Sequence, residues 1–235
     1  MTITEATKYN KSVDVLNMPD RIRRLPVSPL GWPVPWFVTW FDRDGRPCDD
    51  GEGICDFRVV NPAKIVTAVK KSRCWVCGEQ MSAVYKAFVI GPMCAINKVI
   101  SEPPSHRDCA IYAARVCPFL ANPAMRRNDK NMQRGLDEPA GFGLKRNPGA
   151  VCVWITKDFR PFNPVMGQPG VLFSLGRPVE VMWFAEGKRA TRKQVMDSID
   201  SGYPTLVELA KQQGAEAVAA LKTQREVAMV LVPDQ

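Results

Sequence analysis

The residues best placed to do chemistry in this chain are two short pairs of metal ligands. Cys74 and Cys77 form a C-x-x-C turn, and Gly78 relieves the tight turn after the second cysteine. His106 and Cys109 form a second pair at three-residue spacing. Zinc takes four soft or borderline ligands in a tetrahedron, and a C-x-x-C turn supplies two of them from one knuckle. The spacing therefore predicts one structural zinc ion held by these four side chains.

The elements around the two pairs must bring them together. Ser105 is a good N-cap, so a helix over residues 106–117 is expected to carry the second pair on one face of its first turn. Residues 85–100 lie between the pairs and are expected to form a β-hairpin. A knuckle, a hairpin and then a helix N-terminus is the order of a treble clef. We therefore predict a treble-clef-like zinc module over residues 73–120.

The other cysteines have weaker claims to the metal. Cys94 and Cys117 are the reserve ligands, but Cys117 lies about two helical turns beyond Cys109, too far along the axis to share the ion. Cys94 falls among apolar neighbours in an expected strand, and a buried free thiol is its commoner role. Cys48, Cys55 and Cys152 have no partner at ligand spacing. The competing interpretation of the four predicted ligands is also a set of buried thiols.

No catalytic residue is predicted. Four protein ligands leave no coordination position open to water, which indicates a structural site. Treble-clef nucleases need a histidine to activate water, and the single histidine of the chain, His106, is assigned to zinc. Cytidine deaminases need a His-x-Glu motif, which the sequence lacks. We therefore expect a protein that acts by binding rather than by catalysis.

Composition places the chain among globular proteins. It has 235 residues, 46% hydrophobic and 24% charged, and no apolar run approaches the roughly 18 residues needed to span a bilayer. Its first twenty residues are polar and lack the apolar segment of a secretory signal. We therefore expect a cytoplasmic protein, in the host cytoplasm if it is phage-encoded. Eight cysteines there favour metal ligands and buried thiols over disulfides.

Hydrophobic patterning predicts an α+β fold, with the zinc module packed against an antiparallel sheet and C-terminal helices. Strands are expected near residues 36–41, 57–60, 151–156, 171–175 and 179–184. Helices are expected over 62–71, 191–202, 203–213 and 215–231. Asn61 is the expected N-cap of the first, with Pro62 in its first turn, and Thr191 is the expected cap of the second. The chain is divided into a mobile leader (1–20), N-terminal strands and a helix (21–72), the zinc module (73–120), a long basic loop (121–149) and antiparallel strands with C-terminal helices (150–235). Together they are expected to form one compact unit.

The net charge of +8 favours an anionic partner. The expected partner is nucleic acid or a protein machine that handles it. The candidate anion-binding residues are Arg21, Arg23, Arg24, Arg126, Arg127, Lys130, Arg134, Lys188, Arg189 and Arg192. The segment 141–146 lacks the frame of a phosphate-binding loop and is expected to be a solvated loop. Two alternatives remain open: an enzyme or sequestering protein acting on a nucleotide or other phosphate-bearing small molecule, and a phage structural component or host-protein inhibitor.

Three segments have a distinctive sequence: FVIGPMCAIN (88–97), EPPSHRDC (102–109) and WFAEGKRATR (183–192). They resemble a widespread uncharacterised family of bacterial and phage-borne zinc-knuckle proteins, and the likeness covers most of the chain from about Met18 onward. The resemblance implies a bacterial or phage origin. It implies no particular activity, because none is established for that family.

Overall fold

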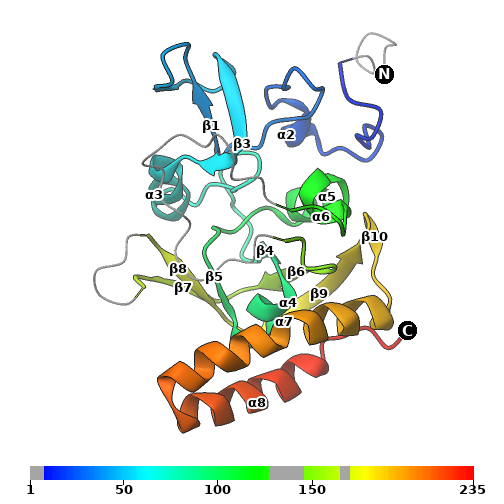
Figure 1. Ribbon diagram of the computed structural model, residues 1–235. Coiled ribbons are helices and arrows are strands. Elements are labelled where there is room, and N and C mark those ends of the chain that lie inside the picture. The colour runs from blue at the N-terminus through cyan, green and yellow to red at the C-terminus, as the bar shows by residue number, and fades with distance from the viewer. Residues whose placement is uncertain (1–7, 127–145, 165–169) are drawn as a thin grey trace.

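The computed structural model describes residues 8–126, 146–164 and 170–235. Its elements in chain order are α2 (Asp20–Arg23), β1 (Val38–Phe41), β2 (Pro47–Cys48), β3 (Ile54–Val60), α3 (Pro62–Lys70), β4 (Lys86–Ile90), α4 (Pro92–Asn97), β5 (Val99–Ile100), α5 (Arg107–Val116), α6 (Pro118–Ala121), β6 (Val151–Thr156), β7 (Phe159–Phe162), β8 (Leu172–Leu175), β9 (Pro178–Ala185), β10 (Lys188–Arg189), α7 (Arg192–Gln213) and α8 (Ala215–Met229). Helices combine with antiparallel strands, so the predicted mixed class is confirmed (Figure 1). Within these ranges, no helix has the length and apolar character needed to cross a membrane.

A four-stranded antiparallel sheet in the order β10-β9-β6-β4 forms the centre of the molecule. The inner strand β6 pairs with β4 in unbroken register from Thr156↔Lys86 to Cys152↔Ile90, and with β9 on its other side. All six residues of β6 are buried. Because side chains alternate between the two faces of a strand, burial of every residue requires cover on both faces of the sheet.

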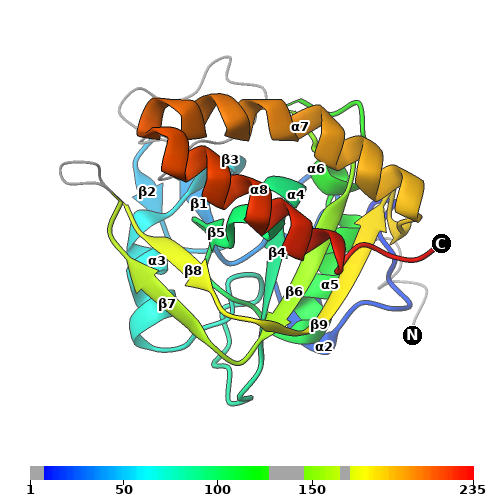
Figure 2. The same cartoon turned by 90° about the horizontal axis from the view of Figure 1, so that it is seen from below.

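Helices supply that cover and give three layers (Figures 1 and 2). On one face, α4, α7 and α8 pack over Phe88, Trp154 and Trp183, which belong to one buried cluster with side chains of these helices. On the other face α5 packs through Ala110 and Ala114, whose small side chains let the helix approach the sheet closely. Figure 2 shows α7 and α8 lying across β4, β6 and β9.

The hairpin expected over residues 85–100 does not form. After β4 the chain enters α4, with Pro92 in its first turn, and β5 then joins a different sheet. Proline suits the first turn of a helix because its missing N–H has no intrahelical partner there. The partner of β4 is β6, which lies far along the chain. Cys94 is therefore in a helix rather than in the expected strand.

The helix expected to end at Gly202 instead continues to Gln213 as α7. Thr191 caps it as predicted, and Gln194 completes a reciprocal capping box. Gly202 is buried, and a Cβ at that position would lie 3.1 Å from Met93 Sδ of α4. Close packing on α4 thus explains the glycine, and the helix tolerates the exposed Pro204 after it. Gly214, with φ of 111°, joins α7 to α8 as expected.

Two smaller sheets complete the fold, in the orders β2-β1-β3 and β5-β8-β7. The strand expected at 171–175, observed as β8, belongs to the second of these and not to the sheet of β6 and β9. Its neighbour β7 was not expected from the sequence. Phe88 of the central sheet contacts Phe159 of β7 edge to face, with ring centroids 5.2 Å apart, and so links the two sheets.

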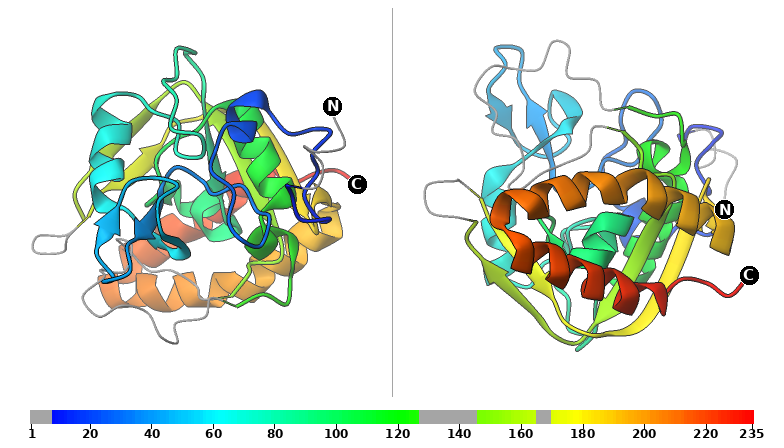
Figure 3. Two further views of the ribbon diagram at one scale, coloured as in Figure 1. Left: turned by 90° about the horizontal axis from the view of Figure 1, so that it is seen from above. Right: turned by 60° about the horizontal axis from the view of Figure 1, so that its bottom comes forward.

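Residues 8–25, which we call the N-terminal strap, run alongside α5 and the C-x-x-C turn (Figure 3). Five apolar side chains of the strap are buried there: Tyr9, Val13, Met18, Ile22 and Leu25. The described part of the leader expected at 1–20 is therefore packed on the fold. The pattern was misjudged because these apolar residues are widely spaced and follow neither helical nor strand periodicity.

Candidate metal centre

Cys74, Cys77, His106 and Cys109 come together as the sequence predicts. One ligand atom from each side chain lies within 4.8 Å of the other three, and the three cysteines are buried. Sulfur atoms around a tetrahedral zinc ion with bonds of about 2.3 Å lie about 3.8 Å apart. The four side chains therefore fit a single metal ion with little movement. In the part of the chain that the structure describes, no other group of this kind occurs.

The first pair is held in a knuckle whose backbone folds back on itself. The N–H of Gly78 donates to the carbonyl of Cys74 at 2.8 Å, and the N–H of Cys74 donates to Glu79 at 2.8 Å. Gly78 has φ of 74°, a left-handed value that favours glycine. A Cβ at this position would lie 2.5 Å from the ring of Trp36. Both the backbone conformation and the neighbouring indole thus require glycine after Cys77.

The second pair stands at the start of α5. His106 is the N-cap and Cys109 lies in the first turn, so the helix begins one residue later than a Ser105 cap would place it. Ser105 instead exchanges two backbone hydrogen bonds with Ala87 of β4, at 2.7 and 3.0 Å. The central sheet thereby positions the second pair. The knuckle and the helix N-terminus are observed without the hairpin between them, so the treble-clef order is not confirmed.

The imidazole of His106 presents Nδ1 to the cluster. Nδ1 lies 3.4 Å from Cys77 Sγ and 4.0 Å from Cys109 Sγ, while Nε2 lies 3.3 Å from the carbonyl oxygen of Gln80. A carbonyl oxygen only accepts, so in the neutral imidazole that a metal would bind, Nε2 would carry the hydrogen and Nδ1 would have a free lone pair. This is the tautomer that a metal ligand needs, fixed by a hydrogen bond from its other nitrogen.

The cluster favours a negative charge on sulfur. Burial raises the pKa of the Cys74 thiol, but hydrogen bonds with Cys109, Cys77 and His106 outweigh burial and lower that pKa overall. Hydrogen bonds with Cys74 and Cys77 raise the pKa of Cys109, and they raise the pKa of His106 to about 10. The Cys74 thiolate is thus stabilised by hydrogen bonds from Cys109, Cys77 and His106. A divalent cation would replace the protons of these hydrogen bonds and stabilise all three thiolates together.

The reserve ligands lie outside this cluster. Cys94 is in α4, where burial raises the pKa of its thiol to about 11, and Cys117 follows the last residue of α5. All eight cysteines are free thiols, and burial raises the pKa of Cys152 in the central sheet. Cys48 and Cys55 are half-buried on the small N-terminal sheet.

The arginines of the strap, predicted to bind an anion, are engaged within the protein. Arg21 pairs with Asp108 at 3.2 Å, and Arg24 pairs with Glu79 at 2.5 Å. Arg23 donates to the carbonyl of Val15 at 3.0 Å. Their sequence context could not reveal this, because the acidic partners lie 87 and 55 positions away along the chain.

The remaining candidate cations are dispersed. Lys188 and Arg189 are exposed on β10, and the Arg189 guanidinium lies over the ring of Phe184, with its carbon 5.3 Å from the ring centroid. Arg192, at the start of α7, donates from its backbone to the carbonyl of Gln235 and from its side chain to the carbonyl of Pro233. Arg126 forms an isolated bridge with Arg146. Three candidates lie outside the described residues, together with most of the basic loop and of segment 141–146: Arg127, Lys130 and Arg134.

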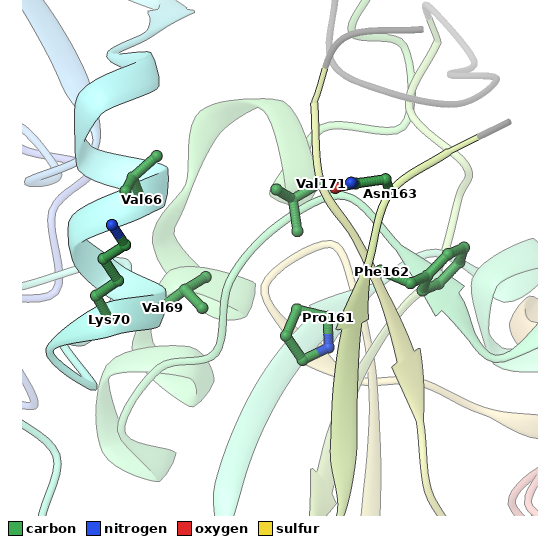
Figure 4. A pocket seen from close by; sticks show the side chains of 7 residues that line it. All are labelled: Val66, Val69, Lys70, Pro161, Phe162, Asn163 and Val171. Atoms are coloured by element: carbon green, nitrogen blue, oxygen red, sulfur yellow. The ribbon is translucent and has the colours of Figure 1, made fainter. Parts of the chain in front are cut away.

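A shallow groove of about 390 Å³ lies between α3 and the strands β7 and β8 (Figure 4). Val66 and Val69 form its α3 side, and Pro161 faces them from β7. Within the described part of the chain, the polar side chains that line it are Lys70 and Asn163. Among the described residues, its lining contains no carboxylate, histidine or cysteine.

Comparison of the chain with protein-family models, with curated proteins and with solved structures finds no match. The interpretation of the metal centre therefore depends on its own geometry.

Proposed function

We propose that Cys74, Cys77, His106 and Cys109 bind one zinc ion, and that the ion is structural. The observation that carries this proposal is the convergence of three thiols and a correctly oriented imidazole within 4.8 Å. Soft sulfur and borderline nitrogen donors in this number are typical of structural zinc sites. Four protein ligands complete a tetrahedral shell, so the ion has no open position for water and supplies no hydrolytic chemistry.

Metal analysis of the purified protein tests this proposal. We expect one zinc per chain by elemental analysis and native mass spectrometry. Cys77→Ser should reduce the metal content to well below one, because it replaces a thiolate with a weak hydroxyl ligand. Cys48→Ser is the matched control, since Cys48 lies outside the cluster. Full zinc occupancy in Cys77→Ser, or no zinc in the unaltered protein supplied with the metal, would refute the assignment.

We further propose that the protein acts by binding, and that its partner is nucleic acid or a machine that handles it. The support is the net charge of +8 together with the absence of a free imidazole, since His106 faces the metal cluster. Lys188, exposed on β10, has no ion-pair partner among the described residues and is available to a phosphate. Cations that neutralise phosphates release counterions, which makes such binding strongly salt-dependent.

Fluorescence polarisation with labelled mixed-sequence DNA and RNA tests the partner. Binding should weaken with added salt, and Lys188→Ala with Arg189→Ala should reduce the slope of log K against log salt by roughly two units for duplex DNA. Lys222→Ala, which removes an exposed cation from α8, is the control. No binding at low salt would remove nucleic acid as the partner. Retention of one small ligand or one host protein after purification would favour the alternatives.

A further inference from the structure

The N-terminal strap is built onto the metal centre. Its buried side chains belong to the same cluster as the three cysteines of the site, and Val76, Met81 and Tyr112 complete that cluster. The strap contacts this region over most of its length, from Tyr9 to Leu25. The position of the strap therefore depends on how the knuckle and the start of α5 are held together.

Two ion pairs of the strap end beside the proposed metal ligands, and a third, between Asp14 and Arg115, reaches the last turn of α5. Arg24 pairs with Glu79, two residues after Cys77, and Arg21 pairs with Asp108, the residue before Cys109. Arg24 thus contacts the knuckle, and Arg21 contacts the first turn of α5, which carries the second ligand pair. These two ion pairs are satisfied together only while the two ligand pairs stay at their observed separation. A backbone hydrogen bond from Trp75 to Pro104, at 3.0 Å, contributes to that separation, and a metal ion bound to both pairs would lock it.

The rest of the fold has its own core. The two clusters on the faces of the central sheet contain none of the strap side chains and none of the four ligands. Phe88, Trp154 and Trp183 are buried against α7 and α8 without contribution from the strap. Loss of the metal would therefore loosen the strap cluster while leaving the three-layer body folded.

We propose that metal occupancy controls the strap: with metal bound the strap is closed on α5, and without it the strap is released. This proposal rests on the metal site proposed above. Release would also free Arg21, Arg23 and Arg24, whose partners are internal in the closed state. The three arginines would then form a compact cationic segment available to phosphates. The chain would thereby couple metal loss to exposure of a polycationic segment.

Trypsin reports on the strap directly, because it cleaves after these arginines. We expect cleavage after Arg21, Arg23 and Arg24 to accelerate at least ten-fold when zinc is removed by a chelator, as followed by mass spectrometry. Cleavage after Lys211 and Lys222, on α7 and α8, is the internal control and should change less than two-fold. Elemental analysis of the same samples establishes the metal content.

Each outcome is decisive. Unchanged strap cleavage in a sample shown to have lost zinc would overturn the strap proposal and leave the metal site intact. Equal acceleration at all five sites would also overturn it, since the body would then unfold with the strap. A protein that takes up no zinc would overturn both proposals.

A variant that retains the metal tests the ion pairs separately. The double variant Arg21→Gln, Arg24→Gln should accelerate cleavage after Arg23 by roughly three- to ten-fold with zinc still bound, since two partly exposed pairs contribute modestly. Arg46→Gln removes an exposed pair with Asp44 and should have no such effect. If the double variant cleaves like Arg46→Gln, the ion pairs do not hold the strap.

Discussion

Replacement of Gly78 by alanine tests whether the knuckle geometry is as tight as the structure indicates. Two costs are expected. An L-residue at φ of 74° is strained by about 1–2 kcal/mol. In addition, the new Cβ would lie 2.5 Å from the ring of Trp36, more than 1 Å inside the contact distance of about 3.5–4.0 Å.

The ring of Trp36 has little freedom to move aside. It meets the ring of Trp75 edge to face with centroids 6.4 Å apart. The Lys64 ammonium lies 5.6 Å from the centroid of the Trp36 ring. Its backbone N–H also donates to Val76 within the knuckle. Overpacking of this kind costs about 1–3 kcal/mol, so Gly78→Ala should lower the free energy of unfolding by about 2–5 kcal/mol in total.

Urea unfolding of the zinc-loaded protein, followed by circular dichroism, measures this loss. Gly51→Ala is the matched control, because Gly51 also has positive φ, 94°, but a Cβ there would lie 3.5 Å from its nearest neighbour. The control should show only the conformational part of the cost. If both variants lose the same stability within about 0.5 kcal/mol, the close approach of Trp36 to the knuckle is refuted.

Three further predictions concern the helices and thiols. Thr191→Ala removes the capping box of α7 and should cost about 1 kcal/mol in urea unfolding, whereas Thr223→Ala inside α8 should cost less. Pro204→Ala restores a backbone donor inside α7 and should raise the urea midpoint by the equivalent of about 1 kcal/mol or more; a lower midpoint would contradict a continuous α7. Since burial raises the pKa of Cys94 to about 11, and also that of Cys152, both thiols stay protonated at pH 8. Iodoacetamide should spare them, while chelation should expose Cys74, Cys77 and Cys109, the proposed zinc ligands, to alkylation, as mapped by peptide mass spectrometry.

Local signals in the sequence predicted local features correctly. The ligand pairs were found because each spans only a few residues and its chemistry depends on spacing alone. Helix starts at Asn61-Pro62 and at Thr191 were found because capping is decided by one or two side chains. The buried strand over 151–156 was found because its apolar residues are continuous.

Features decided by distant contacts were missed. Gly91-Pro92 fits both a turn and a helix start, and only the pairing of β4 with β6 selects the helix. Gly202 is a common helix stop, but close packing on Met93 gives it another role. Likewise, nothing local separates a solvated arginine from Arg21, whose partner Asp108 lies 87 positions away. Tertiary context overrides local preference at each of these places.

The distribution of cores indicates where a bound metal would contribute most to the fold. The central sheet has helices on both faces and buries large aromatic side chains without help. The cluster beside α5 contains no described residue of the central sheet. There the irregular strap packs on the short knuckle. Cys77 and His106 are 29 positions apart, and a covalent cross-link closing a loop of that length would contribute about 3–4 kcal/mol by restricting the unfolded chain. A metal bound to both residues would supply a constraint of the same kind within the cluster that holds the strap. Its removal should therefore act on the strap and the knuckle first.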